Sequence, residues 1–274
     1  MTKKNIDISF IILNYFTKGL VKNCIKSILK SAMGGLTYEV IVVDNGSFDG
    51  VKEMLGKNFS NIKFIQSQKN LGMGAGNNLG IKQARGRYVA VLNPDIIINN
   101  DSIRKLAGFF DNNAKVGLLG PKLINPDGTT QYTRCHYPSK LTPIYRRTPL
   151  RKLSGIKKKL DIYLTKDKDY DTAGPTDWVY GACLFVRKDL LETIGNFDEQ
   201  FFLGFEDTDL CRRVWQAGSE VWYYPQSVLV HYPHRFSGGR GWLVSLFNKN
   251  VRIHIASWLK YEWKYRRRSL TVRT

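Results

Sequence analysis

The sequence is short of acidic residues and has no long apolar run. Its 274 residues include 42 Lys and Arg against 23 Asp and Glu, which leaves a formal net charge of +19. Such an excess attracts polyanions: nucleic acid, anionic lipid or phosphorylated substrates. The hydrophobic fraction of 43% is ordinary for a globular protein, so the composition argues against wholesale disorder.

Closely spaced cysteines are also absent. The four cysteines form neither a CxxC pair nor a zinc-binding spacing, so we expect free thiols in a reducing compartment: Cys24, Cys135, Cys183 and Cys211. Residues 1–7 lack the apolar core of a signal peptide. A membrane-spanning helix needs about 18 or more apolar residues, and the sequence has no such stretch. The expected location is therefore the cytoplasm, with attachment to a membrane surface left open.

The first half of the chain alternates short apolar runs with helical periodicity. Strands are predicted at residues 8–13, 40–43, 62–65 and 88–92, and helices at residues 17–31, 49–55 and 75–84. This alternation predicts an α/β fold with a Rossmann-like, mostly parallel central sheet flanked by helices. The connections between its parallel strands should be right-handed.

The second half is less regular. It predicts helices at residues 102–111 and 207–217, strands at residues 116–119, 178–186 and 221–224, and one long helix at residues 242–268. Residues 146–159 carry a basic run that predicts a mobile loop or a poorly packed helix. We divide the chain into a catalytic domain, residues 1–240, and a basic amphipathic helical tail, residues 241–274.

Polar and glycine-rich segments follow the early strands. Asp44 and Asn45 come directly after residues 40–43, at the strand end where open α/β sheets bind ligands. An aspartate there can accept the N3–H of a uracil or thymine ring, although the same residues also form ordinary turns. The glycines of residues 70–78 would let backbone approach a ligand, or would begin a closely packed helix. Their spacing is neither GxGxxG nor that of a P-loop.

Two further strand ends carry groups that can bind a cation. Asp95 ends the segment Asn93-Pro94-Asp95 after the fourth strand, and a carboxylate there can hold a divalent cation that bridges a diphosphate. His231 ends the apolar run of residues 227–230 and could face the same cation. A polar turn and a structural histidine are the alternatives.

An acidic cluster begins the helix predicted at residues 207–217. Glu206, Asp207 and Asp209 fall within four positions. Carboxylates favour the N-terminal end of the helix dipole, so capping is one interpretation. The other is a general base for an acceptor hydroxyl.

Taken together, the order and spacing of these segments resemble the inverting family-2 glycosyltransferases, and most of all bacterial rhamnosyltransferases. The resemblance covers residues 6–235 and rests on these segments: residues 8–14, 40–49, 70–78, 86–95, 178–191, 195–213 and 221–231. It implies a GT-A fold, a nucleotide-sugar donor and Mg²⁺ or Mn²⁺ as cofactor.

The resemblance also implies roles for individual residues. Asp207 matches the catalytic base, with Glu206 as its neighbour, and Asp95 matches a metal ligand, with His231 as a second. Asn93 stands where the family carries the first aspartate of an Asp-x-Asp motif, so one carboxylate is missing. Trp178 and Gly181 match the acceptor side. The donor-binding residues are Asn14, Asp44, Asn45, Asn70, Gly72, Asn78, Asn93 and Asp95.

The expected activity is inverting transfer of one sugar, with L-rhamnose from dTDP- or UDP-rhamnose as the first choice. N-acetylglucosamine, galactose and glucose are the alternatives. The acceptor would be a polyprenyl-linked glycan or a polysaccharide. A nucleic-acid binder is the rival that the basic charge favours, but the sequence has no helix-turn-helix, RNA-recognition or zinc-finger signature. We therefore expect no nucleic-acid partner.

The C-terminal tail has an apolar aromatic stripe opposite a basic face. This pattern is typical of a helix that lies on an anionic membrane surface, here the inner face of the cell membrane. Core packing or a homodimer seam is the alternative use of the stripe. The stripe contains Phe247, Val251, Ile255, Trp258, Tyr261 and Tyr265, and the basic face contains Lys249, Arg252, Lys260, Lys264 and Arg267.

Overall fold

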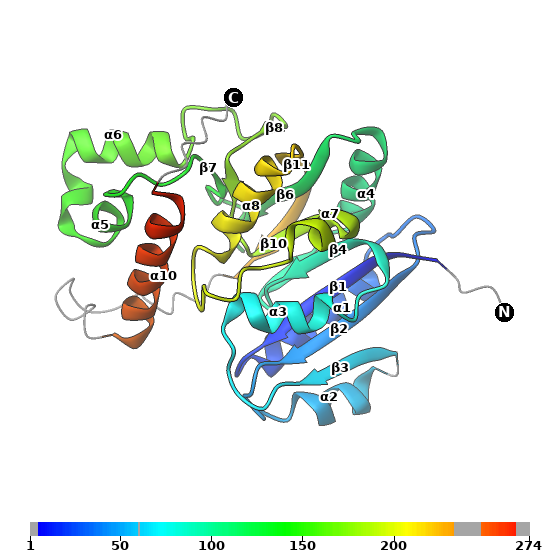
Figure 1. Ribbon diagram of the computed structural model, residues 1–274. Coiled ribbons are helices and arrows are strands. Elements are labelled where there is room, and N and C mark those ends of the chain that lie inside the picture. The colour runs from blue at the N-terminus through cyan, green and yellow to red at the C-terminus, as the bar shows by residue number, and fades with distance from the viewer. Residues whose placement is uncertain (1–4, 60, 233–247, 267–274) are drawn as a thin grey trace.

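A computed structural model describes residues 5–59, 61–232 and 248–266 (Figure 1). Nine strands form its central sheet: β1 (Ile6–Asn14), β2 (Tyr38–Asp44), β3 (Ile62–Gln66), β4 (Gly86–Leu92), β5 (Ile96–Ile98), β6 (Val116–Ile124), β8 (Gly174–Pro175), β10 (Cys183–Arg187) and β11 (Glu220–His231). Their order is β3-β2-β1-β4-β10-β6-β11-β5, and β8 pairs with β11 beside this path.

The strand directions follow from the pairing. β1 is parallel to β2 and to β4, and β2 is parallel to β3. β10 is antiparallel to both β4 and β6, so β6 points the same way as β4, and β11 is parallel to β6. β5 and β8 oppose β11. Six of the nine strands in the described residues therefore run in one direction, which confirms the predicted mostly parallel α/β sheet.

Helices cover both faces of the sheet. On one face lie α1 (Lys18–Lys30), α2 (Val51–Asn58) and α4 (Ser102–Asn112); on the other lie α3 (Met73–Ile81), α7 (Lys188–Ile194) and α8 (Glu206–Gln216) (Figure 1). Successive side chains of a strand point to opposite faces, so Phe10 and Ile12 lie in the same core cluster as Ile25 of α1, whereas Ile11 lies against Gly80 of α3 on the other face. A strand buried on both faces explains the continuous apolar runs.

Residues 178–186 do not form the single strand that the sequence predicts. Instead, β9 (Trp178–Val179) pairs with β7 (Arg134–Cys135) in a small second sheet, and β10 begins only at Cys183. The break lies where the backbone N–H of Gly181 donates to the side chain of Asp207 rather than to a neighbouring strand.

The prediction for residues 221–224 was too short, because β11 runs for 12 residues. Its register shifts between Tyr224 and Val228, the stretch that contains Pro225. Proline has no N–H to donate to a ladder, so it interrupts the regular pairing without ending the strand.

The basic run of residues 146–159 is helical rather than a loop. It spans the end of α5 (Thr142–Arg147), the short 3₁₀ helix η1 (Pro149–Lys152) and the first part of α6 (Ser154–Tyr163). Tyr163 is the buried side chain of α6. The structure thus confirms the poorly packed helix and not the mobile loop.

The predicted C-terminal helix is α10 (Lys249–Tyr265); residues 242–247 and 267–268 of the prediction, Phe247 among them, lie outside the described residues. Its stripe does not face outward as the interfacial prediction requires. Tyr261 and Tyr265 are buried against Phe201 and Phe205, and Val251 is buried as well. Burying aromatic surface is favourable, so the stripe packs on the protein itself.

Lys264 also departs from the prediction of an exposed basic face. Its ammonium lies 2.6 Å from Asp198 and 2.6 Å from the fully buried Asp209. Within the described part of the chain, no helix has the length and apolar character needed to cross a bilayer.

Candidate active site

The first part of the site lies at the carboxyl ends of β1 and β2, where the strand register places Asn14 beside Asp44. Asp44 has no exposed surface, and it accepts hydrogen bonds from Asn14 at 3.0 Å, from the Phe48 N–H at 2.9 Å and from Gln66 at 2.8 Å, as well as from the Ser47 hydroxyl. Burial acts to raise the pKa of Asp44, but these hydrogen bonds outweigh it and hold the pKa below its ordinary value. The carboxylate therefore fixes the loop, and its contact with a nucleotide base stays a prediction.

Exposed aromatic rings surround this loop, and sequence reasoning missed them. Tyr15, Phe16 and Phe48 are 44%, 65% and 62% exposed. Phe16 and Phe48 have φ values of 57° and 50°, a left-handed conformation that costs energy in a residue with a side chain. The sequence could have indicated them, because aromatic residues follow strand ends directly. Their ring faces are accessible, and a planar base can stack on such faces.

The predicted amides brace the loop between β3 and α3. The amide of Asn45 donates to Asn70 at 3.0 Å and to the carbonyl of Gly72 at 3.1 Å. Gly72 has φ 87°, and a Cβ there would lie 2.4 Å from the carbonyl oxygen of Phe202, so the close approach requires glycine. The amide of Asn78 donates to the carbonyl of Phe197 at 2.9 Å. These residues hold loops together, and their contact with the donor stays a prediction.

Strand pairing brings Asp95 and His231 together. The register of β5 and β11 places His231 opposite Ile96, the residue after Asp95. His231 Nε2 lies 3.4 Å from Asp95 Oδ1, and His231 Nδ1 lies 2.8 Å from the side-chain oxygen of Gln131. That carboxylate oxygen is buried and has no hydrogen-bond partner in the described residues. β5 was not predicted, and neither was Gln131.

This pair fits a divalent cation. When the proton of His231 is on Nδ1, this N–H donates to the side-chain oxygen of Gln131. The lone pair of Nε2 then faces Oδ1 of Asp95, which has no hydrogen-bond partner in the described residues. The described residues contain no cluster of three or more His, Cys, Asp or Glu side chains that could hold a metal. Two protein ligands suit Mg²⁺ or a similar ion, which takes its remaining ligands from substrate phosphates and water.

Asp207 lies at the start of α8 and is held by backbone donors. Its Oδ2 accepts from the Gly181 N–H at 2.9 Å, and its Oδ1 accepts from the Thr208 N–H at 2.7 Å. A Cβ on Gly181 would lie 3.1 Å from Asp207, so residue 181 has little room for a side chain. Gly181, predicted on the acceptor side, therefore positions the predicted base.

The two adjacent carboxyl groups differ in their pKa values. Burial and the neighbouring charge of Asp207 raise the pKa of Glu206 to about 8. Burial also raises the pKa of Asp207, against the hydrogen bonds from Gly181 and Thr208. At neutral pH Glu206 is thus protonated, and Asp207 is the carboxylate that can accept a proton. The third acid, Asp209, is fully buried and binds Arg213 at 2.8 Å and the Tyr265 hydroxyl at 2.7 Å, which is a structural role.

Trp178, predicted on the acceptor side, is buried and supports the more accessible ring of Tyr180. Trp178 is 5% exposed and donates to the carbonyl of His136 at 2.8 Å. Its ring stacks on that of Tyr180, with centroids 5.1 Å apart and planes inclined by 16°. Tyr180 is half-buried, and its hydroxyl accepts from Arg146 at 2.9 Å. Sequence reasoning missed both Tyr180 and the role of Arg146.

One dipeptide links Asp207, the predicted base, to the segment that carries Asp95. The Asn93 N–H donates to the carbonyl of Ala182 at 2.9 Å, and Gly181, the residue before, holds Asp207. The segment that carries Asp95 and the carboxylate of Asp207 therefore lie on either side of Gly181 and Ala182.

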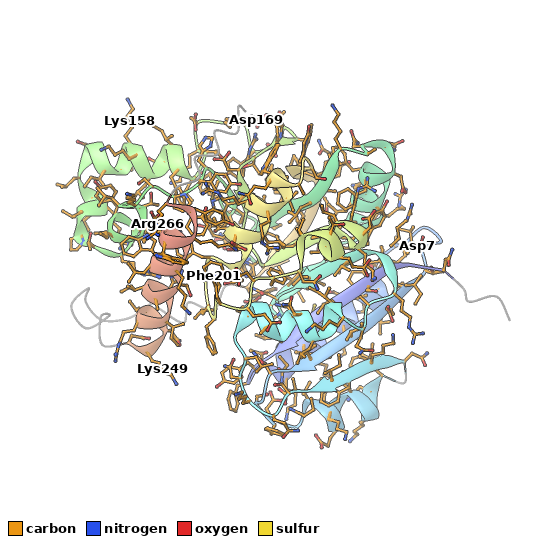
Figure 2. The ribbon with its side chains drawn as sticks, in the orientation of Figure 1. Asp7, Lys158, Asp169, Phe201, Lys249 and Arg266 are labelled. Atoms are coloured by element: carbon orange, nitrogen blue, oxygen red, sulfur yellow. The ribbon has the colours of Figure 1, made fainter. Side chains whose placement is uncertain are left out.

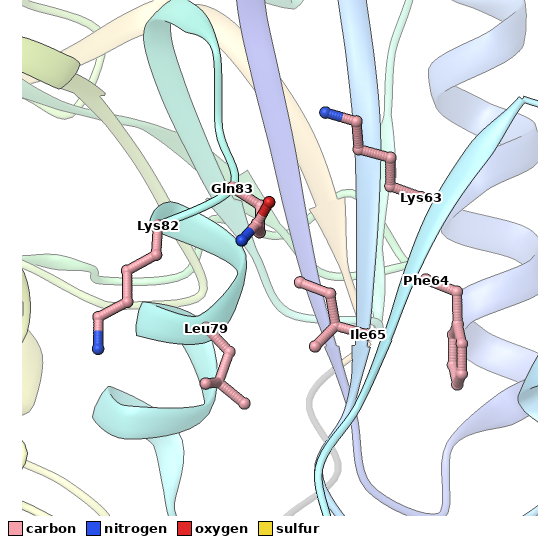
Figure 3. A pocket seen from close by; sticks show the side chains of 6 residues that line it. All are labelled: Lys63, Phe64, Ile65, Leu79, Lys82 and Gln83. Atoms are coloured by element: carbon pink, nitrogen blue, oxygen red, sulfur yellow. The ribbon is translucent and has the colours of Figure 1, made fainter.

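A hollow of about 490 Å³ lies elsewhere, between the edge strand β3 and α3 (Figure 3). It is lined by Lys63, Phe64, Ile65, Leu79, Lys82 and Gln83, none of which is a predicted site residue. It presents no carboxylate or imidazole, so we place no chemistry there.

The sheet order and the carboxylates at its strand ends define the GT-A class of fold, and comparison with solved structures agrees. GalNAc-T7, solved with UDP, GalNAc and Mn²⁺, is similar with a TM-score of 0.65 at 16% identity, over 96% of this chain and 51% of that one. The mannosyltransferase PcManGT from Pyrobaculum calidifontis, solved with GDP-Man and Mn²⁺, gives 0.58 at 14% identity, over 98% of this chain and 77% of that one. At these identities the likeness concerns the fold alone.

Residues 9–195 match the model of glycosyl transferase family 2, and the chain belongs to this family. It is 27% identical to the N-acetylglucosaminyl-diphospho-decaprenol L-rhamnosyltransferase of Mycobacterium tuberculosis, over 73% of this chain and 68% of that protein. It is 25% identical to the rhamnosyltransferase WbbL of Escherichia coli, over 82% and 81%. It is 29% identical to the low-salt glycan biosynthesis hexosyltransferase Agl10 of Haloferax volcanii, over 76% and 61%. The chain is thus a family-2 glycosyltransferase.

Proposed function

We propose that the protein transfers one sugar, with inversion, from a nucleotide-sugar donor to a lipid-linked or polysaccharide acceptor in the synthesis of a cell-surface glycan. The observation that carries the proposal is the arrangement around Gly181 and Ala182. It sets a backbone-held carboxylate, Asp207, beside the segment of Asp95. A general base and a diphosphate-binding group are what such a transfer needs.

In the proposed reaction, Asp207 takes the proton of an acceptor hydroxyl as its oxygen attacks the anomeric carbon of the donor sugar. The bond from that carbon to the diphosphate oxygen breaks, and the electron pair leaves with the nucleoside diphosphate. The raised pKa of Asp207 brings its basicity closer to neutral pH, where a general base works best. A single displacement inverts the anomeric configuration and needs no carboxylate nucleophile.

Mg²⁺ or Mn²⁺ is the proposed cofactor, held by Asp95 and His231 with Gln131 behind the imidazole. When bound, it would neutralise charge on the departing diphosphate. The orphaned oxygen of Asp95 supports this assignment, because an unpaired buried carboxylate oxygen is costly without a partner.

L-Rhamnose from dTDP- or UDP-rhamnose is the proposed donor sugar. Its support is that two relatives, from Mycobacterium tuberculosis and Escherichia coli, are rhamnosyltransferases, at 27% and 25% identity. N-acetylglucosamine, galactose or glucose are the alternatives. The name of the mycobacterial relative supports an acceptor that is carried on a polyprenyl diphosphate.

We also propose that the protein lies on the inner face of the cell membrane, attached through surfaces other than the stripe of α10. Of the 14 exposed large apolar side chains in the described residues, half are on residues 141–162 and on the outer side of α10. The same part of the chain carries basic residues, among them Lys158 on α6 and Arg266 directly after α10 (Figure 2). Apolar side chains within a basic surface suit an anionic bilayer. The apolar set is Leu141, Ile144, Leu150, Leu153, Ile162, Leu259 and Trp263.

The donor is tested by screening a panel of nucleotide sugars for release of nucleoside diphosphate, with EDTA and after Mg²⁺ or Mn²⁺ is restored. We expect one rhamnose nucleotide to be turned over, and EDTA to abolish the turnover. Full activity in EDTA would contradict the metal assignment, and release from no nucleotide sugar would contradict the proposed function.

A further inference from the structure

We propose that Arg146, Arg147 and His254 form a binding site for the diphosphate of the lipid-linked acceptor, between the exposed apolar surface and the catalytic base. The inference rests on the proposed function, because it assumes an acceptor that is carried on a polyprenyl diphosphate. It adds the residues that would recognise that group.

Arg146 is held in place but keeps donors free. Its guanidinium donates to the hydroxyls of Tyr180 at 2.9 Å and Tyr163 at 3.4 Å, and it lies 5.9 Å and 5.6 Å from the centroids of these rings. An arginine has five N–H donors, so three remain after these two bonds. Arg146 is exposed and has no carboxylate partner among residues 5–59, 61–232 and 248–266. A fixed guanidinium with free donors matches the oxygens of a phosphate.

The positive charge around Arg146 is not compensated. Arg147 follows it at the end of α5, and burial together with the charge of Arg146 lowers the pKa of Arg147. Within the described part of the chain, Arg147 also lacks a carboxylate partner. Two adjacent cations that share no acid repel each other, and a bound anion would remove that repulsion.

His254 contributes from α10. Its Nδ1 is buried and has no hydrogen-bond partner among the described residues. Burial and the charge of Arg147 lower the pKa of His254 to about 4, so the ring is neutral and can donate one hydrogen bond. The ring lies against Gly204, where a Cβ would be 2.6 Å away, and edge-on to Phe205 at 5.3 Å. Gly204 and Phe205 lead directly into Glu206 and Asp207.

The cluster is therefore close to the base. Tyr180 links the two, because its hydroxyl accepts from Arg146 and the next residue, Gly181, donates to Asp207. Burial raises the pKa of Tyr180, and the charges of Arg146 and Asp207 both act on the same hydroxyl. In a lipid-diphosphate sugar, the diphosphate is separated from the attacking hydroxyl by the sugar ring alone. The cluster faces such a group when the hydroxyl is at Asp207, and the lipid would then extend toward the exposed apolar residues of α5 and η1.

The test is a binding measurement that needs no sugar transfer. The full-length protein is titrated calorimetrically with farnesyl diphosphate, farnesol and inorganic pyrophosphate, in EDTA so that no cation holds a diphosphate at Asp95. We expect farnesyl diphosphate to bind more tightly than either control. Arg146→Gln and Arg147→Gln should each weaken it about tenfold or more, since each removes a charged donor. Arg151→Gln, an exposed change in the same basic run, should alter it less than twofold.

The outcomes separate this site from the proposed function. Equal binding of farnesyl diphosphate by wild type and both variants, or farnesol binding as tight as that of farnesyl diphosphate, would overturn the site. If Arg146→Gln unfolds because it loses its hydrogen bonds to Tyr163 and Tyr180, the affinity of Arg147→Gln for farnesyl diphosphate still tests the site. With a sugar-bearing lipid diphosphate, Arg147→Gln should raise the acceptor KM more than it lowers kcat. Failure of wild type to use any nucleotide sugar would instead contradict the proposed function.

Discussion

At the scale of single residues, Asp207 and Glu206 show how neighbours with the same chemistry take different roles. Asp207 accepts two backbone N–H groups, whereas Glu206 Oε2 is buried without a hydrogen-bond partner in the described residues. A carboxylate is stabilised by such donors, and burial without them favours the protonated form. The proposed base, Asp207, and its neighbour Glu206 are therefore distinguished by their hydrogen bonds and not by residue type.

This difference predicts opposite results for two nearly isosteric substitutions. Asp207→Asn cannot accept the proton and should lower turnover on the order of 10²–10⁴-fold while donor binding survives. Glu206→Gln replaces a carboxyl group that is already neutral, so its turnover should stay within about tenfold of wild type. Steady-state kinetics with the donor found in the screen measures both. Normal turnover by Asp207→Asn together with an inactive Glu206→Gln would move the base by one residue.

The raised pKa of Glu206 also predicts how stability depends on pH. Its pKa rises from 4.5 to about 8 on folding, so the folded protein binds the proton more tightly than the unfolded chain. The stability that this proton provides is complete below pH 4.5 and is lost as pH rises through about 8. The glutamine of the Glu206→Gln variant does not titrate, so that variant does not lose this stability as pH rises.

The Tm of Glu206→Gln relative to wild type should therefore increase between pH 4.5 and about 8 and then level off. Thermal melts of both proteins across this range test it, with Glu192→Gln, an exposed side chain, as the matched control. A difference in Tm that is independent of pH would show that Glu206 is ionised in the folded protein.

At the scale of elements, the sequence predicted the first four strands and their helices well because β2 and β4 contain continuous apolar runs, residues 40–43 and 88–92, and helical periodicity follows the strands. The same rule failed at residues 178–186, where Gly181 leaves the ladder to hold Asp207. That break depends on α8, which follows more than 20 residues later and cannot be inferred from local periodicity. β5 was missed because three residues carry too little pattern.

The same limit applies to the site. Asp95 and His231 were found at strand ends and Asp207 at an acidic helix start, whereas Gly181 came from the family resemblance. The structure pairs His231 with Asp95 and Gly181 with Asp207. Gln131, Tyr180 and Arg146 were missed because their roles come from tertiary contacts across 100 and 34 residues of sequence. The stripe of α10 was assigned to the wrong surface, since periodicity indicates an apolar face but not what covers it.

α10 itself predicts a stability effect. Lys264→Met removes the ammonium that joins Asp198 to the fully buried Asp209. Breaking a charged hydrogen bond typically costs about 1–3 kcal/mol, so the free energy of unfolding should fall by about that amount. Arg252→Met, an exposed change on the same helix, should cost less than about 0.5 kcal/mol. Urea denaturation compares them, and equal values would show that α10 is not fastened to α8 through this lysine.

At the scale of the whole molecule, α5, η1, α6 and α10 carry both basic residues and exposed apolar side chains. Each Lys or Arg near an anionic leaflet contributes about 1 kcal/mol, so several suffice for reversible attachment. We expect co-sedimentation with anionic but not with neutral liposomes. Replacing Lys157, Lys158 and Lys159 with Gln and Trp263 with Ser should abolish it.

Deleting the tail would be a poorer test, because it would also remove Tyr261, Lys264 and Tyr265 from the packed interface. The matched control replaces Lys22, Lys26 and Lys30 of α1, a helix that packs on the sheet, with Gln. Binding to both lipid types alike, or equal losses in the two variants, would contradict attachment through this surface.

The central claim is a single displacement in which Asp207 activates the acceptor, and the configuration of the product tests it most directly. Proton NMR of the purified product, made from the nucleotide sugar that the screen identifies, gives the anomeric configuration of the new bond. The account predicts the configuration opposite to that of the donor, and no product above background from Asp207→Asn. A product that retains the configuration of the donor would contradict the account, because a single in-line displacement inverts it.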